Sequence, residues 1–352
     1  MKFTNLLVPF LIVFLPFSSF SQDIAIDHAP ISIMGDHMHK AGEYMISLRT
    51  MKMKMSGNIN KSVNLSDSQI INLPNPYQMG SMPAKLSVVP QNMDMNMTML
   101  GFMYAPSDKF TLMAMAMFNG KEMTLNTYKG MMDRAYIGSF ETLSSNKLSS
   151  FSLSTLIRLT NEENHNAHIE IGLSEYSGSN NLKGIVLTPM NMKKNMVLPY
   201  AMQQSDKSKK LIFAYTRNNK INENYHSGFQ IRSISTIEKD KWSYGDRLIF
   251  SGWLQKQFDI NTSGSLAVYF KNEGKINGRD SSIMAPVQTA NPENYGGNTV
   301  EIGFGINKLL TIFPGLHKDR IAIEALIPIN QQPNGTQMKR TWSLTFGYQK
   351  TF

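Results

Sequence analysis

Three features of the 352-residue sequence predict an all-β protein, a transmembrane antiparallel β-barrel of about twelve strands with both termini in the periplasm. Segments of about ten residues alternate apolar and polar side chains, which is the period of a strand with one apolar face. The connectors between these segments alternate long and short, as they do in barrels of outer membranes. The sequence also ends on an amphipathic strand whose last residue is Phe352.

The composition excludes several other classes. Charged residues make up 17% of the chain, against roughly 25% in an average soluble domain. Because no long apolar run accompanies this low charge, a helical membrane protein and an ordinary cytosolic enzyme are both disfavoured. The absence of cysteine excludes disulfides, thiolate catalysis and Cys-based metal sites. The net charge of +9 is not gathered into a basic cluster, so nucleic acid is not expected as a partner.

Residues 1–21 predict a signal peptide. Lys2 precedes an apolar stretch over 6–17, and Ser19 and Ser21 place small residues at the −3 and −1 positions of a cleavage site. The stretch is shorter than the ~20 residues of a spanning helix, which argues against a membrane anchor. Residues 22–41 are then a periplasmic His/Met-rich lead-in or a plug, and residues 42–352 form the barrel. Such a chain is expected in the outer membrane of a Gram-negative bacterium.

The strands follow from period-2 alternation, as in the last one, where Trp342, Leu344, Phe346 and Tyr348 share one face. A soluble sandwich alternates too, but here the opposite face carries small or charged residues, which favours a wet lumen with lipid outside. Aromatic residues near strand ends fit an interfacial girdle: Tyr44, Tyr104, Trp253, Trp342 and Tyr348. Strands are expected at 42–55, 92–105, 109–119, 151–160, 166–176, 209–217, 223–236, 246–257, 261–273, 298–307, 319–329 and 341–352.

Some details fit the barrel pattern less well. The connector 237–245 is short for an outer loop, whereas 308–318 is long for an inner turn. The stretch after Asn119 is expected to form a long outer loop. Lys350 lies on the lipid-facing parity, where an aromatic residue is commoner. The final Phe352 nevertheless predicts recognition by the outer-membrane assembly machinery.

Methionine is unusually abundant, with 26 residues against 24 glycines. In the first three strands the methionines share the parity of Glu43 and Arg49, opposite the apolar residues, and are expected to face the lumen. Thioethers are soft ligands that select Cu(I) or Ag(I). Methionine also packs adaptably around apolar solutes, and the pattern leaves both readings open. The expected thioether wall consists of Met45, Met51, Met53, Met55, Met93, Met95, Met97, Met99, Met103, Met113, Met115 and Met117.

The segment before the first strand concentrates imidazole, thioether and carboxylate groups. These donors fit copper, silver or another transition metal, although their spacing matches no tight motif. The alternative is a solvated or plug-like lead-in, and no cofactor is required in either case. The candidate ligands are His28, Met34, Asp36, His37, Met38 and His39.

Charged side chains on the expected inward parity form a second candidate set. With a nearby serine they would make a hydrolase site, but spacing alone does not bring a serine, a base and its orienting group together. An ion-pair network in the lumen, or a charge ring that selects solutes, explains the same residues. No phosphate loop, dinucleotide fingerprint or zinc-protease helix is present, so the protein is not expected to be an enzyme. The set comprises Arg158, His168, Glu170, Arg232, Glu301 and Glu324.

Several segments resemble an outer-membrane barrel family. They include the run from His28 to Glu43, the run 99–115, Tyr244–Leu248, 291–297 and the end from Glu301 to Phe352. The family consists of proteins labelled "transporter" that are related to the phenol-degradation-pathway MetA-like proteins. Many members carry a Ser-Gly-Leu-Gly-Asp stretch after the third strand. Here only Gly130-Met-Met-Asp133 approximates that stretch, so the resemblance does not define the second outer loop.

The resemblance implies an outer-membrane barrel that transports a small solute without specifying which one. The sequence therefore predicts a channel for a small molecule with a methionine-lined lumen. The alternatives are a barrel that binds or exports copper or silver, and an outer-membrane hydrolase. The expected partners are outer-membrane lipid, the assembly machinery, and a small-molecule or metal solute.

Overall fold

The computed structural model describes residues 24–80, 82–131, 133–313 and 317–352. The predicted signal peptide, residues 1–21, lies outside these described residues.

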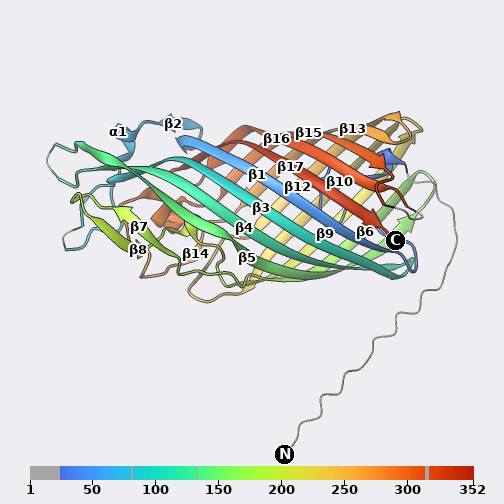
Figure 1. Cartoon of the computed structure of the whole chain (residues 1–352), viewed down its shortest axis with the longest axis horizontal. Helices are drawn as coiled ribbons and strands as arrows, with labels where there is room; N and C mark the ends of the chain where they lie inside the picture. Colours follow the sequence, from blue (N-terminus) through green and yellow to red (C-terminus); the bar gives the residue numbers. More distant parts are fainter. Residues whose placement is uncertain (1–23, 81, 132, 314–316) are drawn as a thin grey trace, which may run out of the picture.

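Twelve antiparallel strands form a closed barrel, as the sequence predicts (Figure 1). Each strand pairs with its neighbour in the chain, and β17 pairs with β1 to close the cylinder. Because closure pairs every edge, the wall leaves no row of backbone groups without a partner. The wall strands are β1 (Tyr44–Asn60), β3 (Val88–Ser107), β4 (Phe110–Tyr128), β5 (Tyr136–Asn161), β6 (His165–Glu175), β9 (Lys209–Asn222), β10 (Tyr225–Glu238), β12 (Arg247–Asp259), β13 (Thr262–Glu273), β15 (Gly297–Leu310), β16 (Asp319–Pro333) and β17 (Gln337–Thr351).

The short elements lie in the segments that connect the wall strands. The strand β2 (Val63–Leu65) pairs with the end of β1, and the helix α1 (Asp67–Ile70) follows it. The remaining short elements are the hairpin β7 (Lys183–Leu187) and β8 (Lys193–Val197), the pair β11 (Trp242–Ser243) and β14 (Asn277–Gly278), and 3-10 helices at Ala25–Asp27, Tyr200–Met202, Gln288–Ala290 and Pro292–Asn294.

The two ends of the barrel differ in their connectors (Figure 1). At one end, which we call the turn end, four connectors have three residues or fewer and the fifth is 311–318. The C-terminal residue lies at the turn end, where the Phe352 amide donates to the Tyr44 carbonyl at 2.8 Å. At the other end, the loop end, the connectors include 61–87, 176–208 and 274–296. Short turns at one end and long loops at the other are typical of outer-membrane barrels.

The expected long loop after Asn119 is wrong. The strand β4 continues to Tyr128 and β5 begins at Tyr136, so a seven-residue connector, 129–135, joins two long strands. The alternation of large apolar residues fades beyond Asn119, and residues 121 and 122 are Lys and Glu. Backbone pairing nevertheless continues, with Asn126 opposite Ser139. The wall therefore extends past its apolar band. Beyond this band the strands do not need an apolar outer face.

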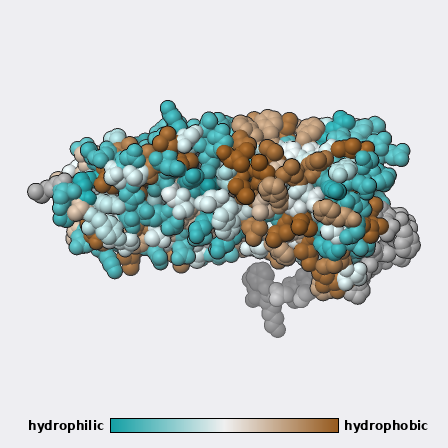
Figure 2. Space-filling model, turned by 90° about the horizontal axis from the view of Figure 1, so that it is seen from above, coloured by the Kyte–Doolittle hydropathy of each residue, from teal (hydrophilic) through white to brown (hydrophobic). Residues whose placement is uncertain are grey.

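The outer surface carries an apolar band over the half of the barrel nearer the turn end, whereas the loop end is largely hydrophilic (Figure 2). Exposed residues of the band include Leu48, Phe102 and Phe346, which are on the parity expected to face lipid. A contiguous apolar surface of this kind on a closed barrel is stable against hydrocarbon and costly in water. The helices of the described residues are too short or too polar to span a bilayer.

One expectation about this surface is wrong, and one residue of the lipid-facing parity is covered. Trp253 is 5% exposed and packs inside the barrel against residues that include Ala29 and Tyr269, so it is not part of an interfacial girdle. Lys350 keeps the lipid-facing parity but is only 1% exposed, since its ammonium donates to the carbonyls of Phe313 and His317. Its ammonium donates to the His317 carbonyl at 2.7 Å and lies 3.4 Å from Asp319 Oδ2. A covered, paired ammonium replaces the aromatic residue usually found near this position.

Candidate functional site

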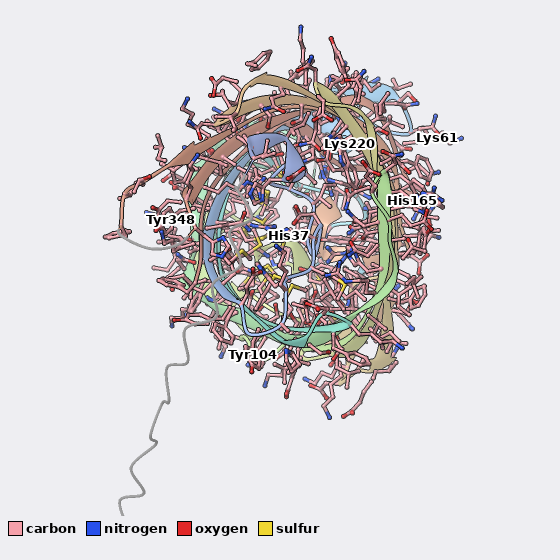
Figure 3. All side chains as sticks on the ribbon, turned by 90° about the vertical axis from the view of Figure 1, so that its right-hand side faces the viewer. His37, Lys61, Tyr104, His165, Lys220 and Tyr348 are labelled. Atoms are coloured by element: carbon pink, nitrogen blue, oxygen red, sulfur yellow. The ribbon has the colours of Figure 1, made fainter. Side chains whose placement is uncertain are left out.

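Residues 24–41, which we call the internal segment, enter the barrel at the turn end (Figure 3). The segment is held by its backbone: wall side chains donate to its carbonyls. Gln230 Nε2 lies 2.9 Å from the Met34 carbonyl, and Asn218 Nδ2 lies 3.0 Å from the Asp36 carbonyl. The segment turns at Gly35, whose φ of +61° favours glycine. Side chains of many wall strands therefore fix the path of a segment that has almost no secondary structure of its own.

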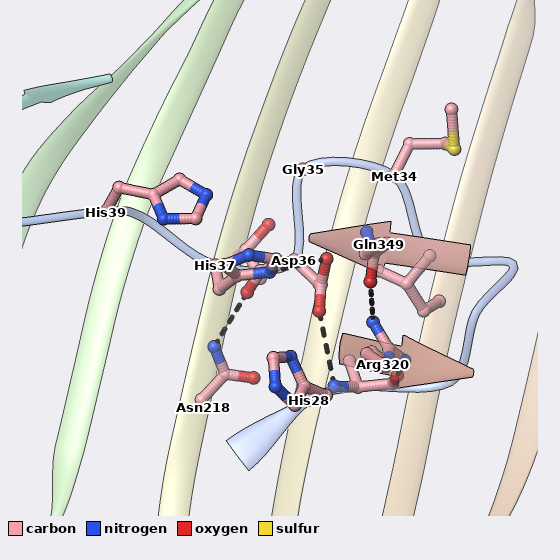
Figure 4. A network of polar contacts seen from close by, with 12 residues as sticks. His28, Met34, Gly35, Asp36, His37, His39, Asn218, Arg320 and Gln349 are labelled. Carbon is pink, nitrogen blue, oxygen red and sulfur yellow. Dashed lines mark hydrogen bonds and ion pairs between the residues drawn. The ribbon is translucent and has the colours of Figure 1, made fainter. Parts of the chain in front are cut away.

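Asp36 lies at the centre of a buried polar network (Figure 4). Its Oδ2 accepts from the Ala29 amide at 3.2 Å, and its Oδ1 lies 3.0 Å from His37 Nδ1. Arg320, also buried, donates to Gln349 and to the Ala29 carbonyl. Burial would raise the pKa of Asp36, but the contact with His37 and the nearby guanidinium groups of Arg320 and Arg49 outweigh this effect and hold the pKa well below its ordinary value. The carboxylate thus stays ionised inside the lumen.

His39 anchors the end of the internal segment. Its amide donates to Thr111 Oγ1 at 3.3 Å, and its ring lies 3.5 Å from Glu43. Burial lowers the pKa of His39 below its ordinary value of 6.5, and this effect outweighs the opposing influence of Glu43. The docked segment therefore favours a neutral His39.

We expect docking of the internal segment to weaken as the pH falls. Below pH 6.5 a released His39 takes up a proton that the docked form resists, so protonation favours release. Between pH 6.5 and the lower pKa of docked His39, each pH unit shifts the equilibrium about tenfold for the one proton taken up. The low pKa of Asp36 acts in the same direction below pH 3.8. Hydrogen exchange of amides 28–39 should show lower protection at pH 5 than at pH 8 after correction for intrinsic rates. Burial also lowers the pKa of His28, so the difference should shrink in a His39→Asn variant and shrink further in the double variant His28→Asn, His39→Asn. Equal protection at both pH values would contradict the role given to His39.

The charged residues of the second candidate set lie among compensating partners. Glu170, 1% exposed, forms an ion pair with Arg232 from β10. Glu301 pairs with Lys271, and Glu324 Oε1 accepts from the Tyr269 hydroxyl at 2.6 Å. The structure thus places these carboxylates in separate interactions around the lumen, not in one ring of like charge.

His168 and Arg158 lie opposite each other on β6 and β5 and both contact the internal segment. His168 Nε2 lies 2.7 Å from the Gly35 carbonyl, and Arg158 Nη2 lies 3.4 Å from the His39 carbonyl. Among the described hydrogen bonds of His168, none reaches a serine. These contacts hold the segment and do not form the nucleophile–base pair that a hydrolase requires.

Methionines of β1, β3 and β4 are paired across the strands. Met45 lies opposite Met103, and Met103 lies opposite Met113. Further pairs follow toward the loop end: Met51 with Met97, Met53 with Met95, and Met55 with Met93. Met99 lies between Arg49 and Met117, and Met115 lies opposite Gly101. None of these methionines is exposed, and sulfur atoms gather inside the ring of strands in Figure 3.

The candidate metal ligands of the internal segment are only partly brought together. The ring of His37 lies 5.6 Å from that of His28 and 5.0 Å from that of His39, centre to centre. Met34, Asp36 and His37 share a small cavity with wall methionines, whereas His28 and Met38 line a polar hollow at the turn end. Within the described residues, no three His, Asp or Glu side chains converge as a metal site.

The sequence did not reveal an apolar cavity of about 490 Å³ at the loop end. Its lining is overwhelmingly apolar and comes from β4, β5, the β7–β8 hairpin and the loop around Val287. Met123, Leu125, Val186, Leu198 and Met202 are among the residues that line it. The available signal was an excess of apolar residues in loops, as in 182–202, where water-exposed connectors are usually polar.

Buried aromatic residues hold the loops that border this cavity. Tyr200 and Trp242 are both 0% exposed, and their rings meet edge to face at 4.8 Å. The Tyr200 hydroxyl accepts from the Asp280 amide at 2.9 Å, which joins two long connectors. The loop end is therefore a packed structure with its own core.

A closed twelve-stranded antiparallel barrel with an apolar outer band is a β-barrel of the outer-membrane type. Its fold is similar to that of an outer-membrane channel from Pseudomonas putida F1, with 12% identity, a TM-score of 0.54, and coverage of 90% of this chain and 98% of that one. A FadL homologue from Pseudomonas aeruginosa matches with 8% identity, a TM-score of 0.43 and coverage of 88% and 90%. No family model and no curated protein matches the sequence. The similarity to the Pseudomonas putida channel supports the fold alone and does not identify a solute.

Proposed function

We propose that this protein is an outer-membrane channel that admits a small, neutral, apolar molecule through its loop end. The observation that carries this proposal is the apolar cavity of about 490 Å³. Its size lies in the range of small-molecule sites, about 300–1,000 Å³, and such sites are lined mainly by apolar side chains. A charged solute would lose its hydration there with few polar partners in return.

In this proposal the loop end faces the outside and the turn end faces the periplasm, in keeping with the usual orientation of long loops and short turns. A solute leaving the cavity meets the paired methionines of β3 and β4, whose thioethers adapt their shape to apolar molecules. The internal segment lies farther along, toward the turn end. No energy source within the barrel is required, because diffusion down a gradient drives the solute inward.

The cavity can be tested with two neighbouring residues of β7. Val186 lines the cavity, whereas Ile185 is 64% exposed and is not part of the lining. Val186→Asp should weaken binding of the neutral fluorophore N-phenyl-1-naphthylamine by about tenfold or more, because a carboxylate in an apolar site costs at least a few kcal/mol. Ile185→Asp adds the same charge to the same strand outside the cavity and should leave binding unchanged.

Transport itself requires a second measurement. Proteoliposomes containing the wild type should take up a small neutral aromatic solute faster than empty liposomes, and Val186→Asp should slow this uptake. A protein that inserts but never permeabilises the liposomes would defeat the channel proposal. Equal effects of the two aspartates would mean that the cavity does not select the solute.

A further inference from the structure

A second, much smaller cavity lies deep in the barrel, between the internal segment and the wall. Its volume is about 20 Å³, which is enough for one water-sized occupant. Gly101 helps to keep it open: a Cβ at this position would lie 2.3 Å from Ser47 Oγ. Both Gly101 and Ser47 line the cavity. A space of this size inside a wall of long side chains is suited to a single ion.

Sulfur dominates the donors around this cavity. One thioether comes from the internal segment and the others from three adjacent strands, together with the ring of His37 and the carboxylate of Asp36. The register places Met45, Met103 and Met113 in one row across the wall, with Met99 and Met115 nearby along their strands. The six lining methionines are Met34, Met45, Met99, Met103, Met113 and Met115.

Packing alone does not account for the distribution of methionine in this wall. The strands β1, β3 and β4 contain thirteen methionines, and none of them is exposed. The exposed large apolar residues of the same strands are of other types: Ile46, Leu48, Leu100, Phe102, Tyr104, Phe110 and Leu112. Leu and Ile fill an apolar interior as well as methionine does. Over residues 45–55, 93–103 and 113–117, every large apolar side chain on the parity of Arg49 is a methionine, which points to the chemistry of sulfur.

The charges around the cavity favour a monovalent soft cation over a divalent hard one. Arg49 lines the cavity, and its guanidinium contacts Met34 Sδ and donates to the Ile33 carbonyl at 3.2 Å. One carboxylate, Asp36, balances this positive charge. Ca²⁺ requires six to eight oxygen ligands, and Zn²⁺ takes about four nitrogen, sulfur or oxygen ligands with anionic thiolates common among them. Thioethers and a neutral imidazole instead select Cu(I) and Ag(I).

We propose that this cavity is a binding site for one soft monovalent cation, Cu(I) or Ag(I), held by thioethers of the wall and of the internal segment with His37. The site joins a segment near the turn end to a wall whose methionine pairs continue toward the loop end. It narrows the metal donors of the internal segment to Met34, Asp36 and His37. This proposal rests on a different observation from the apolar solute, because the two cavities share no lining residue.

The test is a titration of the purified full-length barrel in detergent with silver nitrate, in chloride-free buffer, followed by calorimetry and X-ray absorption at the silver edge. The wild type should bind one Ag(I) per chain with sulfur in its first coordination shell. The variant Met99→Leu, Met103→Leu, Met115→Leu removes three donors at nearly constant volume and should bind about 100-fold more weakly. Heat-modifiable migration on gels reports whether each variant is folded.

The matched control, Met51→Leu, Met95→Leu, Met97→Leu, removes three thioethers of the same wall that do not line the cavity and should retain the wild-type affinity. Gly101→Ala keeps every sulfur atom but adds a methyl group to the cavity, and it should also weaken silver binding. This variant tests the proposed site if the triple variant does not fold. Equal losses in the two triple variants, a silver spectrum without sulfur, or unchanged affinity in folded Gly101→Ala would overturn the proposal.

Discussion

Deletion of residues 24–41 is expected to raise the single-channel conductance of the barrel several-fold. A twelve-stranded barrel is wider than the eight-stranded barrels that side chains fill, but narrower than open porins. The internal segment occupies part of the narrow lumen. Its residues Ala25, Ile31 and Ile33 are all buried. Planar-bilayer recordings of the deleted and full-length proteins measure the difference. An unchanged conductance would show that the segment does not restrict the lumen.

A reversible disulfide between the internal segment and the wall tests whether the segment must move for a solute to pass. Ser32 Oγ and Thr345 Oγ1 lie 3.4 Å apart, and the chain has no native cysteine. The double variant Ser32→Cys, Thr345→Cys should therefore form a single disulfide between the segment and β17 when oxidised. If the segment moves during passage, oxidation should lower solute flux and a reductant should restore it. Equal flux in both states, with the disulfide verified by mass, would indicate a fixed constriction.

Glu170→Ala is expected to destabilise the barrel by about 3–5 kcal/mol, since it leaves the guanidinium of Arg232 buried without its counter-charge. Arg232 is 6% exposed, so water cannot replace the lost carboxylate fully. The measurement is guanidinium-induced unfolding in lipid vesicles, followed by tryptophan fluorescence. The double variant Glu170→Gln, Arg232→Met should recover much of the loss, because no unpaired charge remains.

The control for this prediction is an exposed ion pair of similar composition. Lys209 Nζ lies 2.7 Å from Glu238 Oε2 at the surface, with both side chains about half exposed or more. Removing Glu238 should leave the unfolding midpoint unchanged, because solvent screens such a pair and hydrates the remaining charge. Equal destabilisation by Glu170→Ala and Glu238→Ala would mean that burial of the pair contributes nothing.

The fold could be predicted because each strand of this barrel has an alternating pattern of apolar and polar residues in its own sequence. The alternation of Leu344 and Phe346 with small polar neighbours specifies a strand and its two faces, since a side-chain period of two belongs to no other regular structure. The twelve strands and the antiparallel order follow from repetition of this pattern with short turns between. Strand ends were less predictable, as in β5, because pairing beyond the apolar band leaves no hydrophobic period.

The candidate sites could be predicted only in part. The sequence singled out His28, Met34, Asp36, His37, Met38 and His39, but neighbouring positions in the chain do not fix where the side chains point. The internal segment takes its path from distant wall residues such as Gln230 and Asn218. Residue type places Trp253 at the lipid interface, but its parity is that of Ser251 and Gln255, opposite Phe250 and Leu254, and it packs against the internal segment.

The sequence by itself determined that the chain is an antiparallel barrel of about twelve strands and that methionine is placed on one face of its first strands. Local side-chain periodicity encodes both properties. Only the tertiary structure decided which methionines share a cavity with Met34 and His37, and that loops far apart in sequence enclose an apolar cavity beside Val186. These arrangements depend on the register between strands and on the packing of loops, which arise from contacts between distant residues and leave no periodic signal.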